Sequence, residues 1–236
     1  MTIALFQQDA YQNTCDAEVR AINDRGGIIL NQTIFYPTGG GQPGDSGTLT
    51  FGNSQIKIAT TVKDRESGEI VHVPEAGQSL PEVGQMVKAE IDWDTRYLHM
   101  RMHTALHLLC SVVPCGVTGG QIGKEKSRLD FDVGEKPLDK DQITEDLNRI
   151  IAEKQKVEFR WITDEELENQ PELVRTMSVQ PPKGAGKVRL VKIGENIDLQ
   201  PCGGTHVNNI EEIGVIKVSK IENKGKRNRR VNIVFG

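Results

Sequence analysis

Apolar and polar positions alternate in short runs over the first 92 residues, and turn signals separate the runs. Alternation of this kind, rich in β-branched residues, is typical of half-buried strands. Stretches such as Gly52-Asn53-Ser54 supply the turns. Many short strands at this spacing favour a small β-barrel or sandwich. The expected strands are Asp16–Ala21, Gly27–Phe35, Ser46–Phe51, Gln55–Lys63, Ile70–Val73 and Met86–Ile91.

Helical spacing begins at Asp92-Trp93-Asp94. Apolar residues that recur every three or four positions predict a long helix ending near Val113, before Pro114. Asp94 or Thr95 can cap its first turn. The opposite stripe of the same helix carries Arg96, His99, His103, His107 and Cys110.

The rest of the chain mixes helix and strand patterns. A helix is expected over about Lys140–Lys156, and Thr163-Asp164-Glu165-Glu166 fits a capping box that opens a short helix. Gly184-Ala185-Gly186 is expected to be a loop. The expected strands are Arg128–Val133, Val157–Ile162, Val188–Ile193, Gly214–Ile221 and Arg230–Phe235, the last two as a hairpin. We therefore expect an α+β protein with a small β-barrel domain at 1–92 and, at 93–236, a domain with an antiparallel sheet and the long helix.

Composition excludes several classes of protein. The 236 residues are 36% hydrophobic and 26% charged, which is enough for a buried core and too apolar for a disordered chain. No apolar run approaches the roughly 20 residues of a membrane span, and the N-terminus lacks the basic and apolar parts of a signal peptide. Four cysteines do not suggest a disulfide framework. We expect a cytoplasmic protein with reduced thiols and no membrane association.

Charge is unevenly distributed although the net charge is only −4. Residues 214–236 hold seven basic residues against one acidic residue, a net charge of +6. Two interpretations fit this segment. It is either a strand-turn-strand whose lysines are solvated, or a surface that contacts phosphate groups, with Arg229 and Arg230 among its members.

Two short motifs carry the candidate chemistry. His103 and His107 lie four residues apart on one helix face, close enough to hold one ion, but the Glu that a zincin protease needs is missing between them. Cys202 and His206 flank a glycine turn that can aim both side chains at one point. Each pair alone is weak evidence, whereas together they supply the four ligands of a tetrahedral zinc site.

His99 leaves the choice of ligands open. It precedes His103 by one helical turn, and a helix rises about 12 Å over the eight residues from His99 to His107. One ion therefore takes either the pair His99 and His103 or the pair His103 and His107. In the second case His99 supports the site, packs in the core or faces RNA.

These motifs resemble the editing domain of alanyl-tRNA synthetases. The resemblance is carried by Asp92–Leu109, Arg128–Asp132 and Cys202–Val207, and it continues through Ile213–Lys217 and Arg229–Val231. The segment Phe35–Asp45 is similar to the glycine-rich part of the barrel that precedes that domain. The chain is identified as a member of the free-standing AlaX-type trans-editing proteins, in the medium-length form with a translation-protein-like barrel.

The resemblance implies a hydrolase that deacylates mischarged tRNA(Ala), chiefly Ser-tRNA(Ala) and also Gly-tRNA(Ala), without ATP or an obligate protein partner. It implies one Zn²⁺ per chain, bound by His103, His107, Cys202 and His206. It also implies that a glutamine after the first motif helps the editing site. Gln121 occupies that place, although its neighbours depart from the usual pattern.

Two arrangements of the zinc site stay open. Four protein ligands describe a closed structural site, whereas a catalytic zinc keeps one position free. In the first arrangement Cys202 or His206 is a weak or displaced ligand, and water binds the metal. In the second, zinc holds the amino group or the fold, and water is positioned by Gln121, Thr104 or an RNA hydroxyl.

The loop Gly39-Gly40-Gly41-Gln42 also has two interpretations. It is either a tight turn that requires positive φ, or a place where the backbone closely approaches the acceptor end of tRNA. Two alternative functions remain for the whole chain: a zinc module that binds RNA without catalysis, and a hydrolase for another mischarged tRNA such as Ser-tRNA(Thr).

Overall fold

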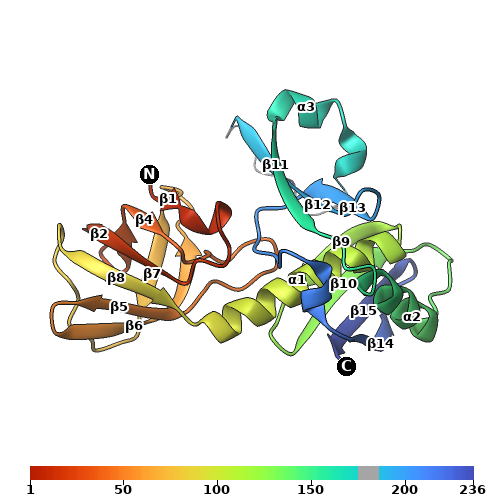
Figure 1. The fold of residues 1–236 in the computed structure, drawn as a ribbon, viewed down its shortest axis with the longest axis horizontal. Coiled ribbons are helices and arrows are strands. Elements are labelled where there is room, and N and C mark those ends of the chain that lie inside the picture. Colours follow the sequence, from red (N-terminus) through yellow and green to blue (C-terminus); the bar gives the residue numbers. More distant parts are fainter. Residues whose placement is uncertain (175–185) are drawn as a thin grey trace. The chain divides into compact units, whose positions relative to one another are not determined.

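The chain forms two compact units, Met1–Tyr97 and Leu98–Gly236, in a computed structural model (Figure 1). The structure describes residues 1–174 and 186–236. Of the loop expected at Gly184-Ala185-Gly186, the first two residues lie outside the described part. The domain limits 1–92 and 93–236 remain a proposal, and the α+β fold class is confirmed.

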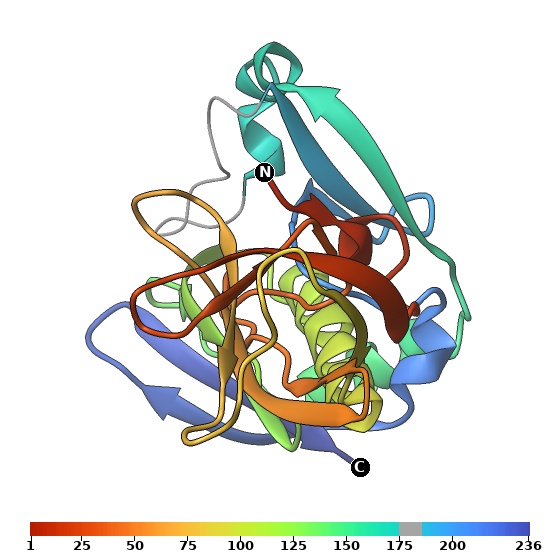
Figure 2. The same ribbon diagram turned by 90° about the vertical axis from the view of Figure 1, so that its left-hand side faces the viewer.

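The first unit is a closed barrel of six strands in which every neighbouring pair is antiparallel (Figure 2). Burial alternates along its strands, as in β8 (Met86–Ile91), because every second side chain faces the interior. The small barrel expected from the alternating pattern is thus confirmed. In order around the barrel the strands are β2 (Thr14–Ile22), β3 (Ile28–Leu30), β7 (Ile70–Pro74), β6 (Ser54–Lys63), β5 (Gly47–Phe51) and β8 (Met86–Ile91). Outside it lie β1 (Ile3–Ala4), η1 (Leu5–Gln7) and β4 (Gln32–Thr33).

A buried ion pair anchors the start of α1 (Trp93–Val112) in this unit. Arg96 has 0% exposure, and its Nε donates to both carboxylate oxygens of Asp45 at 3.0 Å. Its two Nη atoms donate to the carbonyls of Ala10 at 3.0 Å and Ile34 at 2.7 Å, so the whole guanidinium is engaged. Asp45 also accepts from the Tyr36 amide at 2.6 Å.

His72 is fully buried in the barrel and held neutral. Its Nδ1 donates to the carbonyl of Ile28 at 2.9 Å, and its Nε2 accepts from the hydroxyl of Thr33 at 2.7 Å. Burial lowers the pKa of His72 to about 4, because this pocket has no charge to compensate an imidazolium.

The barrel is expected to lose stability as the pH falls from 6.5 to 4. In that window the unfolded chain protonates His72 and the folded barrel does not, so the stability is complete above pH 6.5 and declines below it. The gap between 6.5 and about 4 corresponds to about 3 kcal/mol. Urea unfolding of the wild type and of His72→Gln over this range checks it. The free energy of unfolding of the variant should depend less steeply on pH, by the uptake of one proton. Parallel curves of this free energy against pH for the two proteins would contradict the prediction.

The second unit has two antiparallel sheets (Figure 1). α2 (Lys140–Ile151) docks on the edge strand β14 (Ile216–Asn223), where Asn148 donates to the carbonyl of Ile216 at 2.7 Å and Thr144 accepts from the amide of Val218 at 3.0 Å. The first sheet, in spatial order, is β14 (Ile216–Asn223), β15 (Asn228–Phe235), β10 (Lys126–Asp132) and β9 (Gly116–Gln121). The second is β11 (Val157–Thr163), β12 (Lys187–Ile193) and β13 (Asp198–Pro201). The helices are α1, α2 (Lys140–Ile151), α3 (Asp164–Glu168), η2 (Pro171–Leu173) and η3 (Ile210–Ile213).

Three local expectations need correction. Asp92 caps α1, because its carboxylate accepts from the amide and hydroxyl of Thr95, so neither Asp94 nor Thr95 is the cap. α2 ends at Ile151 rather than Lys156, where the chain turns through Lys154 at a φ of 53°. β9 and β13 were missed, since glycines in one and a proline in the other read as loop. The capping box at Thr163 is confirmed.

Among the helices in the described ranges, none is both long and apolar enough to cross a membrane.

Candidate metal centre

Helix α1 presents two buried histidines from one face. His103 and His107 are four residues apart, and their ring centroids are 5.4 Å apart. Both side chains are buried, with 6% and 5% of their surface exposed. The helical periodicity of the sequence therefore places two imidazoles side by side inside the protein.

The turn after β13 carries the other two candidate ligands. The buried guanidinium of Arg189 holds this turn by donating to the carbonyls of Cys202 at 3.2 Å and Gly204 at 2.8 Å. The amide of Gly204 in turn donates to the Cys202 sulfur at 3.4 Å. Cys202 and His206 consequently point at the same place, with Sγ 3.3 Å from the Nε2 of His206.

The four side chains converge to within reach of one ion. The ligand atoms of His103, His107, Cys202 and His206 all lie within 4.8 Å of one another. The Cys202 sulfur lies 3.4 Å from the Nε2 of His103, close to the edge of about 3.6 Å that a tetrahedral zinc site has between sulfur and nitrogen. Over the described part of the chain, the group that forms includes His107 and leaves out His99, which is buried on the same helix.

Two further residues set the tautomers of the histidines. Asp198 accepts from the Nδ1 of His107 at 2.8 Å and also accepts from Gln200 at 2.8 Å. The Thr104 hydroxyl donates to the Met100 carbonyl at 2.9 Å, and its oxygen lies 3.2 Å from the Nδ1 of His206. Because both Nδ1 atoms are engaged as donors, both Nε2 atoms are available to a cation.

The electrostatics of the cluster favour a thiolate. Burial opposes ionisation of Cys202, but His103 and His206 outweigh it and hold the pKa of the thiol well below its ordinary value. Burial, together with His103, lowers the pKa of His206. Burial also opposes protonation of His107, yet hydrogen bonds with Asp198 and Cys202 raise its pKa to about 10. A thiolate and three imidazoles form a donor set that suits Zn²⁺, and the residues fit the metal that the resemblance implies.

Gln121 and Arg230 lie at a different place from this cluster. Gln121 is exposed at the end of β9, and its amide oxygen accepts from Arg128 at 3.3 Å. It lines a polar hollow of about 320 Å³ together with Lys126, Ser127, Arg128, Glu222, Arg230 and Asn232. None of the four cluster residues lines this hollow.

The two C-terminal arginines point to opposite faces of their sheet, as neighbours in a strand do. Arg230 makes two hydrogen bonds to Asp130, at 2.7 and 2.8 Å. Arg229 donates instead to the side chain of Asn223 at 2.8 Å. Their charges are thus directed to different surfaces, and Arg230 is already paired.

The glycine loop belongs to the first unit and forms a tight turn. Gly39 and Gln42 exchange backbone hydrogen bonds at 3.1 and 2.9 Å. Gly40 and Gly41 have φ angles of 55° and 82°, the left-handed region that favours glycine. The Gln42 side chain is 1% exposed and lies inside the unit.

Sequence reasoning missed Arg189, Asp198 and Gln200, which hold the ligands in place. A signal was present for two of them, because Asp198 and Gln200 precede Cys202 at alternate positions and therefore share one face of a strand. Arg189 lies in another strand, and its contact with the Cys202 turn depends on sheet pairing.

The fold and the site define a class: proteins in which a six-stranded barrel unit accompanies a unit with a buried cluster of three histidines and one cysteine. A family model described as "Threonyl and Alanyl tRNA synthetase second additional domain" matches residues 188–232, and one described as "tRNA synthetases class II (A)" matches residues 2–95.

Whole-chain relatives identify the family. The chain is 36% identical to the alanyl-tRNA editing protein AlaX-M of Methanosarcina barkeri, over 98% of each chain. It is 34% identical to the AlaX-M of Pyrococcus horikoshii, over 99% of this chain and 97% of that one. It is also 35% identical to the alanine--tRNA ligase of Pyrobaculum neutrophilum, over 94% of this chain and 25% of the ligase. The chain belongs to the AlaX family of alanyl-tRNA editing proteins, as its motifs indicated.

Proposed function

We propose that this protein is an aminoacyl-tRNA deacylase that hydrolyses mischarged tRNA(Ala), chiefly Ser-tRNA(Ala) and also Gly-tRNA(Ala). The observation that carries the proposal is the convergence of His103, His107, Cys202 and His206 inside a chain whose relatives are alanyl-tRNA editing proteins. The proposed reaction adds water to the ester carbonyl and releases the amino acid and tRNA. It acts in the cytoplasm and requires neither ATP nor a permanent protein partner.

One Zn²⁺ per chain is the proposed cofactor, held by the four cluster residues. When bound, it would supply Lewis-acid chemistry, by polarising the ester carbonyl or lowering the pKa of a water molecule. Asp198 and Thr104 orient His107 and His206, and Arg189 orients the Cys202 turn. Gln121 remains a proposed aid to the editing site.

Thr104 is better suited to orienting His206 than to activating water. Its single proton is donated to the Met100 carbonyl, and its oxygen faces both the His206 Nδ1 and the amide of Val207, at 3.2 and 3.3 Å. A threonine hydroxyl has one donor and two acceptor positions, so no position remains for water. We therefore assign Thr104 a positioning role.

The variant Thr104→Val is expected to bind zinc about 10- to 100-fold more weakly, the range found when a partner of a metal-binding histidine is lost. Competition with a chromophoric chelator measures the affinity. Thr144→Val is the matched control, because Thr144 also donates to the carbonyl four residues before it, at 2.9 Å, and accepts from a backbone amide. Equal zinc affinities for the two variants would contradict the role of Thr104.

A panel of aminoacylated tRNAs tests the function. The purified protein should release serine from Ser-tRNA(Ala) and glycine from Gly-tRNA(Ala), and leave Ala-tRNA(Ala) intact. Ser-tRNA(Thr) belongs in the panel because one matching family model covers threonyl as well as alanyl enzymes. Turnover of Ser-tRNA(Thr) alone would assign a different substrate. If no member of the panel is hydrolysed, the protein is instead a zinc-containing module that binds RNA without catalysis.

The proposed tRNA contacts are Gly39, Gly40, Gly41 and Gln42 in the barrel unit and Arg229 and Arg230 in the second. Positive charge at the two arginines favours phosphate binding. Arg229 donates to neutral groups, the side chain of Asn223 and the carbonyls of Gly225 and Asn228, whereas Arg230 is paired with the carboxylate of Asp130. Arg229 is therefore the stronger of the two as a proposed phosphate contact.

A further inference from the structure

An exposed tryptophan lies on the sheet face that supports the metal centre. Trp161 follows Phe159 by two residues on β11, so the two side chains share a face. The ring centroid of Phe159 is 6.3 Å from that of His206. Directly opposite Trp161 in β12 is Arg189, whose guanidinium lies 3.8 Å from the Phe159 ring centroid and holds the Cys202 turn.

The same face continues onto β13. Pairing places Gln200 opposite Val191 and Asp198 opposite Ile193, and opposed residues in an antiparallel pair project to the same side. Because Asp198 bonds His107, this is the side that meets the metal ligands. Trp161 is therefore at the outer end of a continuous face that begins at the cluster.

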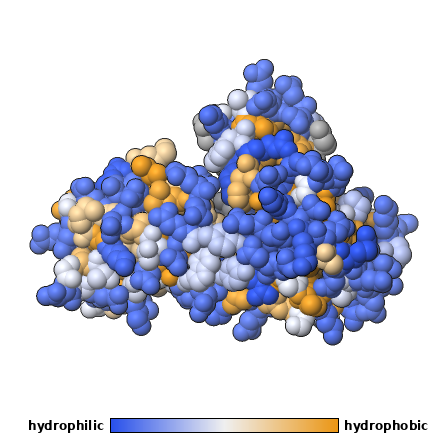
Figure 3. All heavy atoms as spheres, viewed as in Figure 1, coloured by the Kyte–Doolittle hydropathy of each residue, from blue (hydrophilic) through white to orange (hydrophobic). Residues whose placement is uncertain are grey.

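The exposure of Trp161 is unusual. It is 49% exposed, and it is the one aromatic among the large hydrophobic side chains that the structure describes as exposed. Figure 3 shows hydrophobic side chains at the surface over β11 and β12. An indole left half in water next to a buried site has an apolar face available for stacking.

The spacing suits the end of a tRNA. Along a strand, two residues span about 6.6 Å, so Trp161 lies one such step from Phe159, level with Arg189, whose carbonyl accepts from the amide of Cys202. In an aminoacyl-tRNA one ribose separates the ester from the terminal adenine. An ester at the cluster therefore brings the adenine to the outer part of this face.

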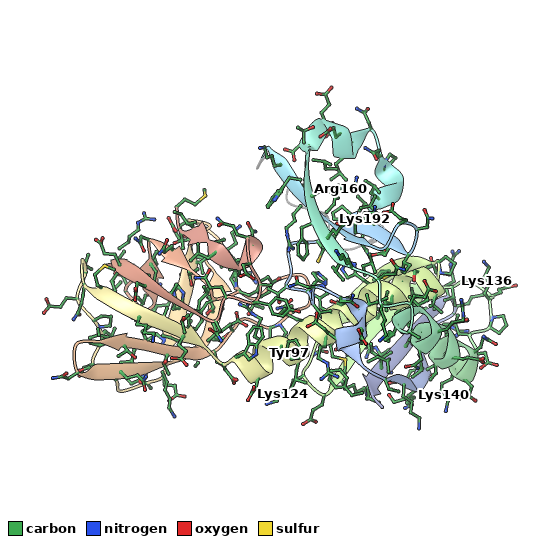
Figure 4. The ribbon with its side chains drawn as sticks, in the orientation of Figure 1. Tyr97, Lys124, Lys136, Lys140, Arg160 and Lys192 are labelled. Carbon is green, nitrogen blue, oxygen red and sulfur yellow. The ribbon has the colours of Figure 1, made fainter. Side chains whose placement is uncertain are left out.

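A basic side chain lies on the same face as Trp161. Lys187 is exposed and pairs with Thr163, the next pair on this face after Trp161 and Arg189. Arg160 and Lys192, which are labelled on this sheet in Figure 4, alternate with these residues and project from the opposite face, where Lys192 pairs with Glu195. A nucleotide whose base stacks on Trp161 would find positive charge for its phosphate in Lys187.

We propose that Trp161 is the stacking platform for the terminal adenine of the substrate tRNA, and that Lys187 contacts the phosphate preceding it. The proposal rests on the proposed function, since it names the part of the substrate that this face binds. Aromatic stacking tolerates any base and adds affinity without taking part in the chemical step.

Fluorescence tests the stacking without any turnover. The chain has two tryptophans, so W93F leaves Trp161 as the sole indole. A minihelix of the tRNA(Ala) acceptor stem that ends in CCA should quench this fluorescence, and the same minihelix without the terminal A should not. Equal quenching by both RNAs, or none by either, would overturn the proposal.

Kinetics separate a failed stacking proposal from a failed function. If the wild type deacylates Ser-tRNA(Ala), W161A should raise KM by about 5- to 150-fold with little change in kcat, and W161F should restore most of it. Val215→Ala, at a 66% exposed apolar position, is the control and should retain the wild-type KM. Wild-type KM in W161A would refute stacking while the function stands. Inactive wild type would refute the function, and the quenching experiment would still decide the stacking.

Discussion

Cys202→Ala is expected to remove the metal and to lower the deacylation rate by more than about 100-fold. This exceeds the effect usually found when a residue that only hydrogen-bonds a metal ligand is lost. Cys202 is the only anionic donor of the cluster, since its thiol ionises well below the ordinary pKa between His103 and His206. Without it only the three imidazoles remain, and they carry no negative charge to offset that of Zn²⁺. Metal analysis after dialysis and hydrolysis of Ser-tRNA(Ala) measure the two effects.

Cys115→Ala is the matched control, because Cys115 is also a partly buried free cysteine and lies outside the cluster. It should retain full metal content and activity. The companion variant His107→Ala distinguishes a catalytic from a structural metal. If it loses zinc but still deacylates Ser-tRNA(Ala), metal chemistry plays no part in the reaction.

Arg96→Ala is expected to destabilise the barrel unit by about 3–5 kcal/mol, the usual effect of removing one partner from a buried ion pair. The substitution leaves the Asp45 carboxylate buried without its counter-ion and deprives two backbone carbonyls of donors. For a chain of this size each kcal/mol shifts Tm by roughly 2–4 °C. Urea unfolding in a W161F background measures it, since Trp93 packs against the barrel core and is then the sole indole.

An exposed arginine of the same unit supplies the control. Arg65→Ala should change the free energy of unfolding by less than about 0.5 kcal/mol, as is usual for surface positions. A loss below about 1 kcal/mol in Arg96→Ala would mean that the ion pair contributes no more than an exposed one. The folded fraction should keep its metal content, because Arg96 belongs to the barrel unit and the metal cluster to the other.

Local periodicity accounts for the elements that could be predicted. Alternation in strands such as β8 and the three-to-four-residue spacing in α1 reflect which side of an element faces the core, and neighbouring residues decide that. Prediction failed where a local rule was overridden. β9 and β13 form despite their glycines and proline because adjacent strands supply hydrogen-bond partners.

The candidate site divides in the same way. Spacing alone paired His103 with a histidine one turn away, and it could not choose between His99 and His107. The structure places His107 in the cluster, and Asp198, which lies 91 residues after His107 in the chain, accepts its Nδ1–H. No local pattern encodes that contact.

The sequence by itself determined the kinds of ligand, the pair Cys202 and His206, and the family, because residue type and spacing within a helical turn or a glycine turn are local properties. Only the tertiary structure decided which imidazoles meet the thiolate, that Arg189 and Asp198 hold the cluster, and that Trp161 lies on the face of the cluster. Those facts follow from the pairing of β11 with β12 and of β12 with β13. Strand pairing brings together residues that are far apart in the chain, and no periodic pattern in the sequence indicates which residues will meet.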